Sequence, residues 1–195
     1  MKSSNINDII VETPLFIGGW YIDKTLCNKL INYFEQHPDK AAGRIGSSRL
    51  VDRTKKASTD LNIRLPVRSE LLKTYLSELQ KVCEEYKKMY PECNKGHTPW
   101  GVLDFNIQKY LPNEAYFLAH NDRMSKSNSS RLLVFSTYLN DIKEGGETEF
   151  IYQKLKVKPE KGLTIIFPID WTNTHKGIPA PKEIKYLLTG WYNYI

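Results

Sequence analysis

Two segments in the first half of the chain carry hydrophobic residues at helical spacing. The first begins after Asp23, a residue type suited to capping a helix N-terminus, and it ends before His37-Pro38. The second extends from about residue 67 to residue 90, where Pro91 stops it. The apolar positions of the first segment are Leu26, Cys27, Leu30, Ile31 and Phe34. Those of the second segment are Leu72, Leu76, Leu79, Val82, Cys83, Tyr86 and Met89. We predict two amphipathic helices, each with an apolar face that needs a partner surface.

Two polar stretches interrupt these patterns. Residues 46–61 are basic and poorly periodic, which predicts a loop and makes this stretch a candidate lid. Residues 123–130 are similarly polar and form a second candidate lid.

From Gly101 onward the pattern changes to short runs rich in Val, Ile, Phe, Tyr and Thr. Turn signals such as Pro112-Asn113 and Gly145-Gly146 separate these runs. The predicted strands are 102–110, 115–122, 131–139, 148–152, 154–158, 163–167, 173–177 and 184–194. This order of elements favours an α+β fold that is mainly β, with a sandwich or a barrel, jelly rolls included, as its core.

Composition narrows the class of protein. The 195 residues are 41% hydrophobic and 26% charged, which is typical of one globular domain. The net charge of +6 is spread along the chain, so a nucleic-acid partner stays open without being indicated. Three cysteines lack metal-site spacing, and neither a membrane span nor a signal peptide is recognisable. We therefore predict a cytoplasmic protein without a membrane partner.

The segment 175-HKGIPAPKEIKYLLTGW-191 carries polar residues in an unusual arrangement. If residues 184–194 form a strand, then Lys185, Leu187, Thr189 and Trp191 share one face. A lysine on a buried face needs an anion, and the neighbouring hydroxyl and indole N–H would suit a carboxylate ligand. On these residues alone, a surface lysine beside an ordinary tryptophan is the simpler interpretation.

A second arrangement lies in 120-HND-122. His120 and Asp122 are two apart, so on a strand they project to the same side and can reach one metal ion. His175 is the obvious third ligand, which would give the two-histidine, one-carboxylate set of non-haem iron oxygenases. A three-histidine site fits less well, because His37 and His97 lie in proline-flanked loops. Taken alone, most HxD spacings are accidental.

The ordered combination is more specific than its parts, and it resembles the Fe(II)/2-oxoglutarate dioxygenases. Within them the chain is similar to the prolyl 4-hydroxylase-like group, which includes small bacterial and phage-encoded members. The resemblance covers about residues 104–194. Its motifs are 131-RLLVFSTYLND-141, 145-GGETEF-150, 157-VKPEKG-162 and the distal HKG…KYLLTGW.

The resemblance implies roles for individual residues. His120, Asp122 and His175 would bind Fe(II), and Lys185 would pair with the distal carboxylate of 2-oxoglutarate. Thr189 would hydrogen-bond the same carboxylate. The other residues expected at the cosubstrate are Tyr110, Tyr138, Thr148, Phe150 and Trp191.

The resemblance also implies a fold and an activity. The fold would be one domain over 1–195, with helical support and a lid in 1–100 and a cupin-like double-stranded β-helix, or jelly roll, in 101–195. The activity would use O2 and 2-oxoglutarate to hydroxylate a proline-containing peptide, releasing succinate and CO2. It leaves open whether ascorbate is used. Oxidation of a nucleobase, a free amino acid or another small molecule is the alternative chemistry, and a catalytically silent β-barrel that serves as a binding module is the non-enzymatic alternative.

Overall fold

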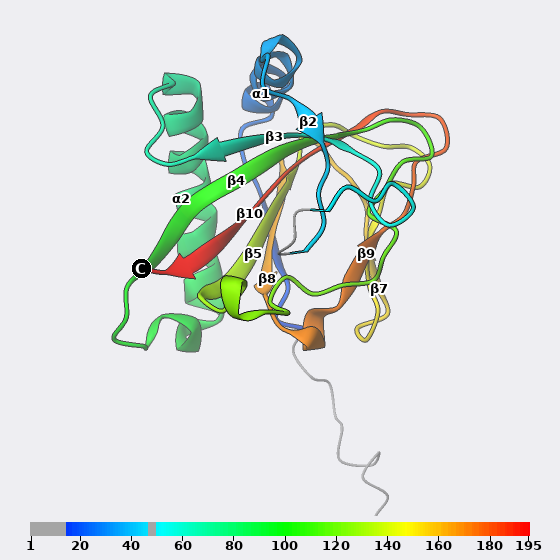
Figure 1. Ribbon diagram of the computed structural model, residues 1–195. Helices are drawn as coiled ribbons and strands as arrows, with labels where there is room; N and C mark the ends of the chain where they lie inside the picture. The colour runs from blue at the N-terminus through cyan, green and yellow to red at the C-terminus, as the bar shows by residue number, and fades with distance from the viewer. Residues whose placement is uncertain (1–14, 47–49) are drawn as a thin grey trace, which may run out of the picture.

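The computed structural model describes residues 15–46 and 50–195, and its largest element is a seven-stranded antiparallel sheet. The strand order in this sheet is β1-β8-β5-β10-β4-β3-β2 (Figure 1). Its strands are β1 (Gly18–Tyr21), β2 (Ala41–Ala42), β3 (Thr59–Arg64), β4 (Trp100–Tyr110), β5 (Arg131–Tyr138), β8 (Leu163–Pro168) and β10 (Lys185–Tyr194). A three-stranded antiparallel sheet contains β7 (Leu155–Val157), β6 (Thr148–Phe150) and β9 (His175–Gly177), in that order.

Two helices, α1 (Lys24–Gln36) and α2 (Glu70–Met89), pack against one face of the large sheet. Both predicted helices are confirmed, and the Asp23 side chain caps α1 by accepting from the Thr25 amide at 2.8 Å. The predicted apolar face of α2 needs one correction. Met89, the last helical residue, is exposed, whereas Tyr75 is fully buried and its hydroxyl lies 3.0 Å from that of Thr137.

The opposite face of the large sheet looks toward the small sheet. Side chains from both sheets meet there in a second apolar cluster. Its members are Tyr110, Val134, Tyr138, Phe150, Ile165, Phe167, Ile169 and Leu187. A cavity of about 980 Å³ opens beside this cluster and is lined by residues of both sheets. The predicted fold class, α+β and mainly β with supporting N-terminal helices, is confirmed.

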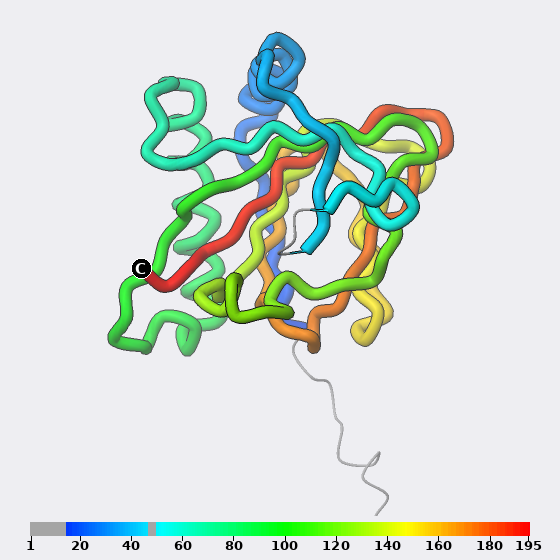
Figure 2. The backbone as a smooth tube through the Cα atoms, in the orientation of Figure 1, coloured from blue at the N-terminus to red at the C-terminus, as the bar shows by residue number. Residues whose placement is uncertain are grey.

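The predicted strand 115–122 is not continuous. It forms only isolated bridges, between Tyr116 and Lys56 and between His120 and His175. The Phe117 and Leu118 amides both donate to the Lys55 carbonyl, at 2.8 and 3.2 Å. A regular ladder gives each carbonyl one such donor, so the segment bends here in the manner of a bulge. It still runs between residues 52–58 and β9 (Figure 2).

The loop predicted over 46–61 is partly wrong. Residues 59–61 begin β3, which pairs with β4, and the Lys56 side chain is buried. Two further strands, β1 and β2, were not predicted. Residues 47–49 of the loop, like the N-terminal residues 1–14 on which the absence of a signal peptide was judged, lie outside the described residues.

The short 3-10 helices are η2 (Pro91–Asn94), η3 (Lys126–Asn128) and η4 (Trp171–Asn173). The second candidate lid, 123–130, contains η3, and its Arg123 is paired with Asp170. Among the helices of the described residues, none is both long and apolar enough to span a bilayer.

Candidate metal centre and cosubstrate pocket

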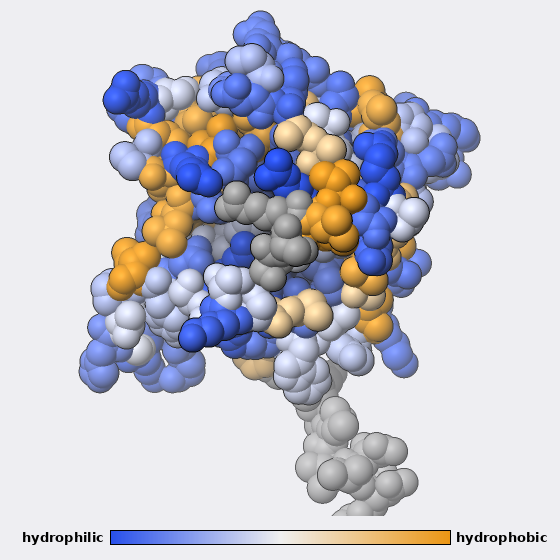
Figure 3. Space-filling model, in the orientation of Figure 1, coloured by the Kyte–Doolittle hydropathy of each residue, from blue (hydrophilic) through white to orange (hydrophobic). Residues whose placement is uncertain are grey.

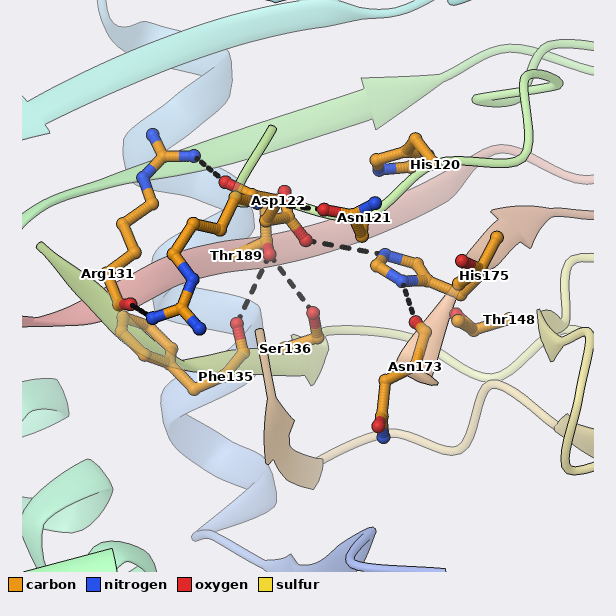
Figure 4. Close-up of polar contacts among 12 residues, drawn as sticks. His120, Asn121, Asp122, Arg131, Phe135, Ser136, Thr148, Asn173, His175 and Thr189 are labelled. Atoms are coloured by element: carbon orange, nitrogen blue, oxygen red, sulfur yellow. Dashed lines mark hydrogen bonds and ion pairs between the residues drawn. The ribbon is translucent and has the colours of Figure 1, made fainter. Parts of the chain in front are cut away.

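Three potential metal ligands converge at one end of the cavity. Ligand atoms of His120, Asp122 and His175 all lie within 4.8 Å of one another. His175 Nε2 is 3.6 Å from Asp122 Oδ2, and the two imidazole rings are 4.5 Å apart (Figure 4). The backbones of His120 and His175 exchange two hydrogen bonds of 2.9 Å, which brings β9 beside the irregular segment.

Backbone carbonyls fix the protonation pattern of both imidazoles. His120 Nδ1 donates to the Leu118 carbonyl at 2.9 Å, and His175 Nδ1 donates to the Asn173 carbonyl at 3.0 Å. A carbonyl can only accept, so each Nδ1 carries a proton, and in the neutral form of either ring Nε2 then has a free lone pair. Burial and the neighbouring His175 lower the pKa of His120 to about 4, which keeps this imidazole neutral at pH 7.

This donor set fits ferrous iron. Two imidazole nitrogens and one carboxylate oxygen on one side of an ion leave the opposite positions of an octahedron open. The apolar rings of Phe150 and Phe167 pack against His175, at centroid distances of 5.7 and 5.1 Å. Phe150, which was expected to line the pocket, is fully buried behind His175 and supports it from there.

Lys185 lies at the other end of the same cavity, at the start of β10. Its side chain is almost completely buried, and Nζ donates to the Gly146 carbonyl at 2.7 Å. The ammonium lies over the rings of Tyr110 and Tyr138, 5.7 and 5.4 Å from their centroids. No carboxylate of residues 15–46 or 50–195 lies within ion-pair distance of it. Burial lowers the pKa of Lys185 to about 8, opposed by the charge of Glu147.

Two of the predicted cosubstrate residues are joined beside this lysine. The Tyr138 hydroxyl donates to Thr148 Oγ1 at 2.7 Å. Thr148 lines the cavity, whereas Tyr138 is fully buried behind it and supports both Thr148 and Lys185. Tyr110 lines the cavity too, and its hydroxyl donates to Gln108 Oε1 at 2.9 Å.

Thr189 lines the same cavity but lies elsewhere in it. Its hydroxyl contacts Ser136 Oγ at 3.0 Å and the Phe135 carbonyl at 3.2 Å. Residues four apart on a strand are separated by about 13 Å, so the structure does not bring Thr189 and Lys185 to one point. The predicted sharing of one carboxylate by these two side chains has no support in this geometry.

Arg131 is a site residue whose place the sequence did not reveal. Its guanidinium carbon lies 3.5 Å from the ring centroid of Trp191, and Nη1 donates to the Asp122 carbonyl at 3.0 Å. The Trp191 indole N–H is buried and has no partner among the described residues. Strict alternation along β5 would place Arg131 on the same face as Leu133 and away from Trp191, but the register shift between Tyr192 and Asn193 brings it to the cavity, and no local sequence pattern reports that shift.

The cavity is open to solvent on one face of the molecule. Both hydrophilic and hydrophobic residues surround the centre of this face (Figure 3). Its apolar lining residues include Leu50, Leu118 and Met124, all of them exposed. The volume exceeds what one small diacid needs, so space remains for part of a second molecule.

Comparison with known families agrees with this geometry. Residues 105–193, which contain the three potential ligands and Lys185, match the sequence model of the 2OG-Fe(II) oxygenase superfamily. Probable prolyl 4-hydroxylase 9 of Arabidopsis thaliana is 32% identical over 114 residues, which cover 45% of this chain and 39% of that protein. Probable prolyl 4-hydroxylase 10 of the same plant is 25% identical over 201 residues, which cover 88% and 65% of the two chains. The chain thus spans between about two fifths and two thirds of the length of these relatives.

Solved structures share the fold. The prolyl-4-hydroxylase of Pseudomonas putida has a TM-score of 0.70 at 18% identity, covering 91% of this chain and 92% of that one. The Trichoplax adhaerens prolyl hydroxylase, in complex with a peptide fragment of the oxygen degradation domain of hypoxia inducible factor, has a TM-score of 0.75 at 17% identity, covering 92% and 84%. The viral collagen prolyl hydroxylase of Paramecium Bursaria Chlorella virus-1, as its 2OG complex, has a TM-score of 0.67 at 19% identity, covering 92% and 96%.

A two-sheet core whose cavity holds two imidazoles, one carboxylate and a buried lysine has the features of a mononuclear iron oxygenase. Residues 105–193 thus resemble the 2OG-Fe(II) oxygenase superfamily, and the chain is similar in sequence and fold to prolyl 4-hydroxylases. This similarity points to Fe(II) and 2-oxoglutarate, which the donor set and the buried lysine of the cavity fit.

Proposed function

We propose that this protein is an Fe(II)- and 2-oxoglutarate-dependent dioxygenase that hydroxylates peptidyl proline. One observation carries the proposal: the three potential ligands line the same cavity as a buried lysine that has no carboxylate partner among the described residues. In this proposal, residues 1–195 act as one domain, with the helices of 1–100 supporting the core in 101–195.

His120, Asp122 and His175 would hold the iron through Nε2 of each imidazole and one carboxylate oxygen. When bound, the metal supplies activation of O2 coupled to oxidative decarboxylation of 2-oxoglutarate. The residues themselves orient the reactants. The Leu118 and Asn173 carbonyls keep both rings in the ligating tautomer, and Phe150 and Phe167 exclude water behind His175.

Lys185 would bind the far carboxylate of 2-oxoglutarate. A buried ammonium is stabilised by an anion, so binding would raise its pKa from about 8 and keep it charged. Thr148 and Tyr110 offer hydroxyl groups on the walls of the same end, and Tyr138 holds Thr148 in place. Thr189, further along β10, would contact the cosubstrate only on the metal side of the cavity.

The substrate would enter beside Trp191 and Arg131. The buried indole N–H of Trp191 would donate to a carbonyl of the substrate, since buried donors are rarely left unpaired. The exposed side chains of Leu118 and Met124 at the opening would contact the apolar ring of a proline residue. The peptide complex of the Trichoplax prolyl hydroxylase, which has the same fold, supports a peptide as the class of substrate.

The test is succinate formation from 2-oxoglutarate under air, with Fe(II), in the presence and absence of a proline-containing peptide. Peptide-dependent succinate, together with a peptide mass gain of one oxygen atom, is the expected result. Parallel reactions with and without ascorbate would show whether this reductant sustains turnover. Succinate formation that never depends on a peptide would shift the assignment to a different acceptor. A complete absence of 2-oxoglutarate consumption would favour a binding module.

A further inference from the structure

The segment that carries His120 depends on a part of the chain far from it in sequence. On one edge, the segment pairs with β9 through His120 and through the bond from the Gly177 amide to the Tyr116 carbonyl, 2.8 Å. On the other edge, the Ala57 amide donates to the Ala115 carbonyl at 2.9 Å, and the Lys55 carbonyl accepts from Phe117. The irregular segment therefore lies between β9 and residues 55–57, and residues 55–57 lie at the edge of the cavity on the side of the small sheet.

A buried ion pair lies at this edge. Lys56 Nζ is 2.6 Å from Asp60 Oδ2, with the two side chains only 5% and 14% exposed. Asp60 also accepts from Ser58 Oγ at 2.7 Å and from Gln108 Nε2 at 3.3 Å. The chain packs closely over this pair at Gly43, where an added Cβ would lie 2.1 Å from Ser58 Oγ. A buried ion pair often adds little to the stability of the folded protein. We therefore consider a role for the Lys56–Asp60 pair in orienting other groups.

One arm of this network reaches the cosubstrate end. Because Gln108 donates its amide nitrogen to Asp60, its amide oxygen faces Tyr110 and accepts the tyrosine proton at 2.9 Å. The Tyr110 ring lies under the ammonium of Lys185, 5.7 Å from centroid to Nζ. Asp60 thereby determines how the Tyr110 hydroxyl is oriented in the cavity.

The other arm reaches the metal end. The Lys56 ammonium lies 5.7 Å from the ring centroid of Tyr116. That ring is stacked on the His120 imidazole, with centroids 3.8 Å apart and an angle of 15° between planes. The imidazole is thus held on one face by Tyr116 and at Nδ1 by the Leu118 carbonyl.

We propose that the Lys56–Asp60 ion pair is a positioning element for this site, which orients the His120 imidazole through Tyr116 and the Tyr110 hydroxyl through Gln108. The inference rests on the proposed function, because it assigns His120 to the metal and Tyr110 to the cosubstrate. Lys56 and Asp60 do not bind iron themselves. They orient a metal ligand, His120, and a residue of the cosubstrate pocket, Tyr110. Residues that contact metal ligands have this role in other metalloproteins.

The experiment measures binding rather than turnover. Metal-free full-length protein is titrated with Mn²⁺ by calorimetry without O2, and the Mn²⁺-loaded form is then titrated with 2-oxoglutarate. Lys56→Met should weaken Mn²⁺ binding by about 10- to 100-fold, the range found for partners of metal ligands. It should also weaken 2-oxoglutarate binding, by a smaller factor. The matched control is Lys73→Met, which removes an exposed lysine of α2 and its pair with Glu70 and should stay within about twofold of wild type.

Two further variants separate positioning from loss of folding. Lys56→Met/Asp60→Asn removes both charges and leaves no unpaired buried ion, so it should fold while still binding Mn²⁺ more weakly. Tyr116→Leu, which removes the stacked ring, should show the same loss, and Tyr116→Phe, which keeps the ring, should not. Wild-type Mn²⁺ affinity in a folded double variant would overturn the inference. If the wild-type protein itself failed to bind Mn²⁺ and 2-oxoglutarate, the proposed function would fall, and this inference with it.

Discussion

The two ends of the cavity are built in different ways. The Lys185 end lies on regular strands, where β10 is paired along most of its length with β4 on one side and β5 on the other. The metal end lies on an irregular segment and on the three-residue strand β9, joined by a few backbone bonds. Regular pairing of β10 with its neighbours positions Lys185, whereas contacts between segments distant in sequence position the metal ligands. Substitutions at the two ends should therefore separate metal binding from cosubstrate binding.

The largest expected effect is at the metal end. His175→Ala removes one of three ligands, so the variant should retain no iron after desalting and should not turn over 2-oxoglutarate. Metal analysis of the purified protein is the measurement. His97→Ala, which removes an exposed histidine, is the control and should keep wild-type iron. Wild-type iron in His175→Ala would contradict the assignment of the ligands.

The next effect is at the opposite end. Lys185→Ala should leave Mn²⁺ binding nearly unchanged and should weaken 2-oxoglutarate binding by about two to four decades. This range corresponds to about 3–5 kcal/mol for the loss of one partner of a buried ion pair. Lys185→Arg should lose less, because the charge is kept while the geometry differs. The exposed Lys182 provides the control, and Lys182→Ala should bind the cosubstrate normally.

A smaller effect is expected from pH. The pKa of Lys185 is lowered to about 8 by burial, so the free protein loses this charge as the pH rises through 8. Affinity for 2-oxoglutarate should be constant well below pH 8 and should fall by about tenfold per pH unit well above it. Calorimetry of the Mn²⁺ form in buffers of different ionisation enthalpy should also detect proton uptake on binding near pH 9. In Lys185→Arg the dependence should disappear, and an unchanged slope there would assign it to another group.

The smallest effect tests where Thr189 lies. Thr189→Val removes the hydrogen bonds to Ser136 and to the Phe135 carbonyl, worth about 1 kcal/mol, so 2-oxoglutarate affinity should fall by no more than about fivefold. A loss as large as that of Lys185→Ala would show that Thr189 and Lys185 hold the same carboxylate after all.

Local periodicity explains what the sequence could predict. The two helices and the cavity face of β10 follow from spacings of 3.6 and 2 residues, which need no knowledge of distant partners. Thus Lys185, Leu187 and Thr189 line one cavity as predicted. The strand β3, which lies between β4 and the two-residue edge strand β2, has the sequence TDLNIR and was missed because only two of its residues are apolar. Its strand structure comes from pairing with β4, which no local signal reports.

The metal end shows the limit of local patterns more clearly. The apolar runs and turn signals suggested a regular strand over 115–122, but the backbone bonds of this segment to Lys55 and to His175 determine its shape. The positions of Arg131 and of the Lys56–Asp60 pair depend on partners that fold onto them from other elements. Such contacts arise only when the tertiary structure forms, so one sequence cannot reveal them.

The bond between the Lys185 ammonium and the Gly146 carbonyl has a consequence for ligand length. This bond and the pairing of β10 with its neighbours keep the positive charge at a fixed separation from the metal ligands. A 2-oxo diacid must span that separation to satisfy both ends at once. Diacids with one carbon fewer would leave the ammonium unpaired, and those with one carbon more would have to bend. The protein should therefore discriminate among 2-oxo dicarboxylates by the length of their carbon chain alone.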